Sequence, residues 1–74
     1  MSALVIPHPD GITWERWSET VVGFNPQFTN QLWAGMRWQE FARRLSLIEP
    51  AAPRPEFFKD WRPWAAALRQ ALEA

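Results

Sequence analysis

The 74-residue sequence contains no cysteine and no tyrosine, and it has only one lysine, one histidine and three glycines. Without cysteine, the chain forms neither disulfides nor thiolate metal sites. The three glycines make no phosphate-binding fingerprint. No apolar run approaches the about 18 residues that cross a membrane, and residues 1–7 lack the basic segment of a signal peptide. These absences exclude several common routes to stability, catalysis and membrane attachment.

Charge of either sign is not in excess, because eight basic and eight acidic residues give a net charge of zero. A neutral chain has little general attraction to nucleic acid or to anionic lipid. The densest basic patch is Arg37, Arg43 and Arg44. We interpret it as a solvated helix face on which Arg37 pairs with Glu40. Neither nucleic acid nor a membrane is an expected partner.

No residues suggest catalysis or cofactor binding. His8 stands between two prolines, and neither a cysteine nor a second histidine is present to share a metal ion with it. The carboxylates are scattered singly, and we interpret Asp10 and Asp60 as helix caps. No serine or threonine has a nucleophile motif around it. The sequence therefore predicts a protein that is not an enzyme and has no cofactor or metal.

Aromatic residues are abundant instead, with six tryptophans and five phenylalanines. Short chains bury a small fraction of their surface, so large aromatic side chains would help to build a core. Tryptophan is also enriched at binding hot spots, as is arginine, which supplies seven of the eight cations. The aromatic residues therefore allow two alternatives: the tryptophans form the core, or some of them face a partner.

Hydrophobic periodicity predicts a single all-α domain over residues 1–74, a three-helix unit with an N-terminal arm. The predicted segments are an extended arm over 1–11, helices over 11–22 and 26–47, a proline-rich linker over 49–56 and a last helix over 60–73. In the arm, Pro7 and Pro9 exclude a helix. The apolar residues before them must pack on the chain's own helices or on another subunit.

The last helix shows the clearest pattern, because Trp61, Trp64, Leu68 and Leu72 share one face at helical spacing. A similar Trp-x-x-Trp spacing occurs at residues 14–17. Its helix begins at an N-cap formed by Asp10 or Thr13 and is expected to stop at Gly23.

In the second helix, which we expect to begin with Asn25 as N-cap, Gly35 is unfavourable by about 1 kcal/mol relative to alanine. We attribute this glycine to the close approach of another helix or of a tryptophan ring.

Residues 57–72, Phe-Phe-Lys-Asp-Trp-Arg-Pro-Trp-Ala-Ala-Ala-Leu-Arg-Gln-Ala-Leu, resemble a helix found in small tailed-phage proteins encoded among virion structural genes. Those helices show Trp-x-x-Trp-Ala followed by leucines at helical spacing. The resemblance implies a structural or adaptor role in the neck, tail, fibre or capsid region of a phage particle. The protein would be made in the host cytoplasm and reside in the virion, in multiple copies.

We therefore expect the chain to bind larger virion subunits through its helices and arm. The alternative is a small phage-encoded inhibitor that binds one host protein. The residues predicted to contact the partner are tryptophans, leucines of the last helix and two apolar residues of the arm: Trp14, Trp17, Trp33, Trp38, Trp61, Trp64, Leu68, Leu72, Leu4 and Ile6.

Overall fold

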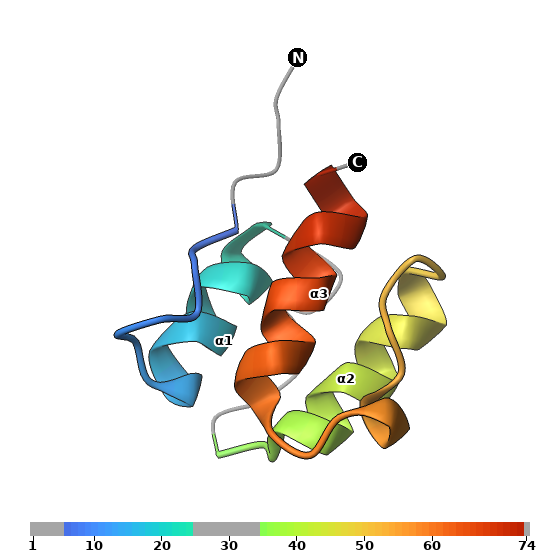
Figure 1. Ribbon diagram of the computed structural model, residues 1–74, viewed down its shortest axis with the longest axis horizontal. Coiled ribbons are helices and arrows are strands. Elements are labelled where there is room, and N and C mark those ends of the chain that lie inside the picture. The colour runs from blue at the N-terminus through green and yellow to red at the C-terminus, as the bar shows by residue number, and fades with distance from the viewer. Residues whose placement is uncertain (1–5, 25–34, 74) are drawn as a thin grey trace.

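The computed structural model describes residues 6–24 and 35–73, which form three α-helices and one short 3-10 helix. The elements are α1 (Trp14–Phe24), α2 (Trp38–Ile48), η2 (Pro55–Phe57) and α3 (Trp61–Glu73). Figure 1 shows α3 running between α1 on one side and α2 on the other. The described residues contain no strand, so the all-α prediction is confirmed.

Helix α1 begins directly after Thr13, whose Oγ1 accepts a hydrogen bond from the Arg16 amide at 3.3 Å. This is an N-cap interaction, so Thr13 rather than Asp10 caps the helix. The start lies three residues after the predicted one, because Gly11 occupies a turn with φ +73°. Gly23 lies inside the helix, which continues to Phe24. The prediction that Gly23 stops the helix is therefore wrong.

Helix α2 begins at Trp38 and ends at Ile48. Gly35 has φ +80°, and Arg37 is extended with φ −70° and ψ 151°. A single helix over 26–47 is therefore wrong at residues 35–37. A Cβ atom on Gly35 would meet nothing within 4 Å, so the positive φ, not a close approach, favours glycine here. The predicted N-cap Asn25 lies outside the described residues, as does Trp33.

The segment between α2 and α3 contains turns and the 3-10 helix η2, with Pro55 at its first position. Of the two adjacent phenylalanines, Phe58 packs partly against the core, whereas Phe57 is 79% exposed. Asp60 Oδ2 accepts a hydrogen bond from the Arg62 amide at 3.4 Å, directly before α3 begins at Trp61. The expected cap at Asp60 is confirmed.

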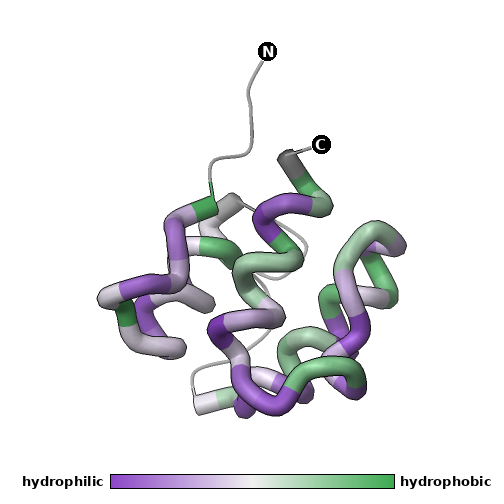
Figure 2. The backbone as a smooth tube through the Cα atoms, viewed as in Figure 1, coloured by the Kyte–Doolittle hydropathy of each residue, from purple (hydrophilic) through white to green (hydrophobic). Residues whose placement is uncertain are grey.

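The core gathers the apolar faces of the three helices together with Ile6 from the arm and Ala52 from the linker. Hydrophobic and hydrophilic residues alternate along the helices in Figure 2, as expected when each helix buries one face. The largest fully buried side chains include Trp17, Trp64 and Phe41. Aromatic rings from all three helices thus meet at the centre of the molecule.

Candidate functional site

The two Trp-x-x-Trp pairs, one on α1 and one on α3, pack directly against each other. Every cross pair is in contact, with ring centroids 5.6 Å apart for Trp14–Trp61, 6.4 Å for Trp14–Trp64, 5.7 Å for Trp17–Trp61 and 5.8 Å for Trp17–Trp64. Their interplanar angles of 51–69° are tilted or edge-to-face, geometries that aromatic rings prefer. The repeated spacing therefore reflects a shared packing task.

Trp64 also joins α3 to α2. Its ring lies 5.9 Å from that of Trp38 and 6.1 Å from that of Phe41, which it meets at 87°. Trp64 itself has no exposed surface. One side chain of α3 therefore contacts aromatic residues of both other helices.

Three tryptophans also donate hydrogen bonds that hold the non-helical segments against the helices. The indole Nε1–H of Trp14 donates to the Met36 carbonyl at 2.9 Å, that of Trp17 to the Pro7 carbonyl at 2.8 Å, and that of Trp64 to the Pro53 carbonyl at 2.9 Å. A buried indole without a partner would be costly. In the described chain no buried side-chain nitrogen or oxygen lacks a partner. These bonds hold the arm, the residues directly before α2 and the linker against the helices.

The arm packs on the chain's own helices in the part that is described. Ile6 is 1% exposed, and its carbonyl accepts a hydrogen bond from Arg69 Nε on α3 at 3.0 Å. Pro9 is buried as well. Of the two alternatives for the arm, residues 6–9 follow the intramolecular one, and Leu4 lies outside the described residues.

Of the eight residues predicted to contact a partner that the structure describes, five are enclosed in this core. Trp17, Trp64 and Leu68 have no exposed surface, and Trp61 is 7% exposed. In this conformation these side chains, like Ile6, offer a partner almost no surface. Trp14, Trp38 and Leu72 are half-buried and pack against the same cluster. For all the tryptophans that it describes, the structure therefore favours a place in the core over contact with a partner.

The large apolar residues that are exposed in the described chain occur elsewhere, on α2 and η2. Leu47 is 85% exposed, Phe57 79% and Ile48 36%. The sequence reasoning missed Leu47, although a signal existed. Phe41 and Leu45 define the buried stripe of α2, and a residue two positions after Leu45 points about 200° away from it. Leu47 is therefore an apolar residue on the polar side of an amphipathic helix.

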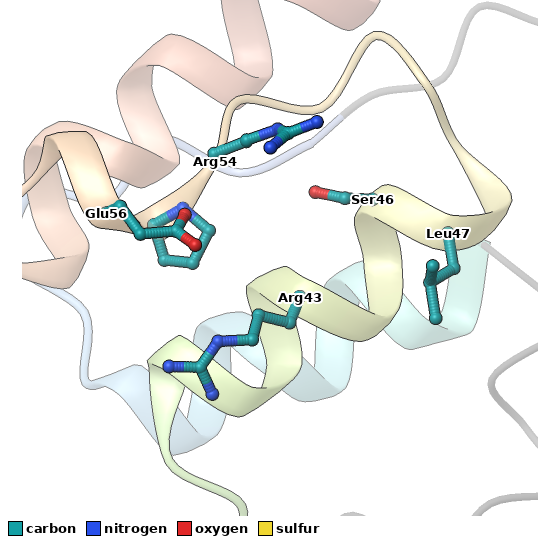
Figure 3. A pocket seen from close by; sticks show the side chains of 6 residues that line it. Arg43, Ser46, Leu47, Arg54 and Glu56 are labelled. Atoms are coloured by element: carbon teal, nitrogen blue, oxygen red, sulfur yellow. The ribbon is translucent and has the colours of Figure 1, made fainter.

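Leu47 lines a depression of about 420 Å³ between α2 and the segment that leads into η2. Figure 3 shows how Arg54 and Glu56 lie across this α2–η2 depression from Arg43, Ser46 and Leu47. The buried Pro55 is also part of its lining. It is thus a partly apolar hollow with charged side chains around it.

The charged groups of the α2–η2 depression have no partners among the described residues. The ion pairs among the described residues lie outside the depression: they are Asp60–Arg62 and, if the histidine is protonated, His8–Asp10. Arg43, Arg54 and Glu56 are exposed and belong to neither pair. Unpaired guanidinium and carboxylate groups beside apolar side chains suit recognition of another protein.

The remaining candidate residues add no second site. Arg37 and Glu40 are exposed, as expected of a solvated face, but the predicted ion pair between them is absent. They line a smaller hollow of about 340 Å³ that shares Arg43 with the α2–η2 depression. His8 is exposed and lies 3.3 Å from Asp10. The described residues contain no group of three potential metal ligands.

Comparison of the chain with protein-family models, with curated proteins and with solved structures gave no match. Within the described residues, no helix is long and apolar enough to cross a membrane.

Proposed function

We propose that this protein acts without catalysis, by binding another protein through the α2–η2 depression, as a structural or adaptor component of a tailed-phage particle. The observation that carries the proposal is the exposure of Leu47, 85%, beside the unpaired Arg43 and Arg54. An exposed apolar group rimmed by polar ones is typical of an interaction site.

Folding gives no reason for this surface. The aromatic core is enclosed by the chain itself, with Trp17 and Trp64 fully buried. Leu47 is outside that core, so its exposure is not needed for packing. Arginine and aromatic residues are enriched at interfaces, and here they are Arg43, Arg54 and Phe57. The proposed contact surface therefore shifts from the tryptophan faces to α2 and η2.

The phage context comes from the resemblance of residues 57–72. In the structure, Trp61, Trp64 and Leu68 of this stretch are buried in the core. The motif therefore has a packing role in this chain, and the phage role is proposed by analogy with the resemblance alone. The analogy directs the choice of partner to test first, which is a virion subunit.

Mass spectrometry of purified particles tests this proposal. We expect the protein in particles of the phage that encodes it, at a fixed ratio to a larger structural subunit. Leu47→Asp should prevent incorporation while leaving the fold intact. The control Glu19→Gln changes an exposed residue of α1 and should be incorporated normally. A protein absent from the particles would contradict the virion role.

A second candidate function, inhibition of one host protein, is favoured by the enclosed core. A core completed without a neighbouring chain suits a regulator that works alone in solution. We expect such a regulator to retain one stoichiometric host protein in a pull-down from lysate, and to lose it with Leu47→Asp. No stoichiometric partner in that experiment would remove this candidate. The two candidates differ in whether the partner belongs to the particle or to the host.

A further inference from the structure

The α2–η2 depression presents both a protruding apolar side chain and a hollow on the same small surface. Leu47 is 85% exposed, and the hollow beside it measures about 420 Å³. In a two-fold symmetric contact, the same patch of both copies meets, so each feature of one copy faces a different feature of the other. A protrusion and a hollow on one patch satisfy this requirement.

The charges of the depression point to the same kind of partner. Arg43 and Arg54 would repel a basic segment, and Glu56 would repel an acidic one. None of the three has an ion-pair partner among the described residues. A second copy brings a carboxylate to the arginines and arginines to the carboxylate at the same time. Two copies also have no overall repulsion, because the net charge of the chain is zero.

We propose that two copies of this chain associate through their α2–η2 depressions across a two-fold axis. Leu47 of each copy enters the hollow of the other, and Glu56 of each copy pairs with Arg43 or Arg54 of the other. The inference rests on the proposed function, in which this depression binds protein. Six residues line the patch, so we expect the contact to bury less than about 1,200 Å², the lower limit of standard interfaces. The dimer should therefore be weak and concentration-dependent.

Sedimentation velocity of the full chain over a series of concentrations, up to the millimolar range, tests the dimer. The variant Glu56→Arg places only positive charges on the patch, and Arg43→Glu/Arg54→Glu places only negative ones. Each variant alone should associate at least about tenfold more weakly, because like charges then face each other. An equimolar mixture should restore association, whichever arginine pairs with Glu56.

The matched control is Glu19→Arg, which reverses an exposed glutamate on α1, outside the depression. It should dimerise like the wild type, and circular dichroism should show native helix content in every variant. Recovery in the mixture also excludes misfolding as the cause of the loss in each single variant.

Two results would overturn the inference: a wild-type chain that is monomeric at every concentration, and a dimer that Glu56→Arg leaves unchanged. The proposed function fails in a different way. Suppose that the wild type is monomeric but still enters particles or retains a host protein, and that Leu47→Asp abolishes this binding. That result would refute the symmetric dimer alone. A dimer that responds to the charge reversals, with no other partner, would support the inference and contradict the adaptor and inhibitor roles.

Discussion

Large apolar side chains and polar groups occur both in the aromatic core between α1 and α3 and in the α2–η2 depression. The two regions differ in whether the polar groups have partners within the chain. In the core, the indole N–H groups of Trp14, Trp17 and Trp64 each donate to a backbone carbonyl at 2.8–2.9 Å. In the depression, Arg43 and Arg54 have no ion-pair partner among the described residues. The indole N–H groups of the core thus find their partners within the chain, whereas the charged groups of the depression are exposed to solvent.

This difference also separates residues that stabilise the fold from residues that only contact solvent. Aromatic pairs whose ring centroids are about 4.5–7 Å apart, as in the core, contribute about 0.5–1.5 kcal/mol each to stability beyond the area they bury. Exposed side chains away from such contacts change stability by about 0.5 kcal/mol or less when replaced. Substitutions in the two regions should therefore differ severalfold in their effect on the free energy of unfolding.

The largest effect is expected for Trp64→Ala. Trp64 is fully buried and contacts aromatic rings of α1 and α2, so its removal should lower the free energy of unfolding by about 3–5 kcal/mol. Chemical denaturation followed by tryptophan fluorescence measures this loss. The matched control Phe57→Ala removes an aromatic ring that is 79% exposed and should have little effect. Equal losses for both variants would contradict the distinction between core and surface.

Ile6→Ala tests whether the arm belongs to the core of its own chain. Ile6 is 1% exposed, and truncation of a buried isoleucine costs about 2–5 kcal/mol. The control Ile48→Ala, at a residue that is 36% exposed at the end of α2, should cost clearly less. Thermal unfolding of dilute protein measures both. An unchanged melting temperature for Ile6→Ala would mean that the arm contributes nothing to the isolated chain.

The sequence predicted the fold class and the last helix because those depend on local, periodic signals. Trp61, Trp64 and Leu68 have helical spacing, and Asp60 is a recognisable cap, so α3 was placed to within one residue. The start of α2 was misplaced for an identifiable reason. Apolar residues before Gly35 continued a plausible stripe, and a glycine in the sequence does not reveal that its φ is +80°.

The candidate site was harder to predict, because it depends on contacts between distant segments. A tryptophan looks the same in the sequence whether it faces a partner or donates to a carbonyl ten residues away, as Trp17 does to Pro7. Arg43 and Arg54 meet at one depression only after the linker folds back beside α2. Of these residues, only Leu47 could have been identified from the sequence, because it lies off the buried stripe of its helix.

Gly35→Ala should show that the approach to α2 is set by backbone conformation. An alanine at φ +80° costs about 1–2 kcal/mol, although a Cβ atom there would meet no neighbour. The matched control Gly23→Ala lies inside α1, where the same substitution should raise stability by about 0.5–1 kcal/mol. Opposite signs in urea denaturation are expected. A stabilised Gly35→Ala variant would instead favour the continuous helix.

The smallest effect on stability, and the most informative one for function, is expected for Leu47→Ser. Leu47 is 85% exposed, whereas Leu45, two residues earlier on α2, is 1% exposed. Leu47→Ser should change the free energy of unfolding by less than about 0.5 kcal/mol, while Leu45→Ser leaves a cavity and a hydroxyl in the core, at a cost of at least about 2 kcal/mol. Leu47→Ser should nevertheless weaken association in sedimentation, because it removes the apolar group at the centre of the proposed contact. Similar losses of stability for both leucines would place Leu47 in the core, and the α2–η2 depression would then have no free apolar group to offer a partner.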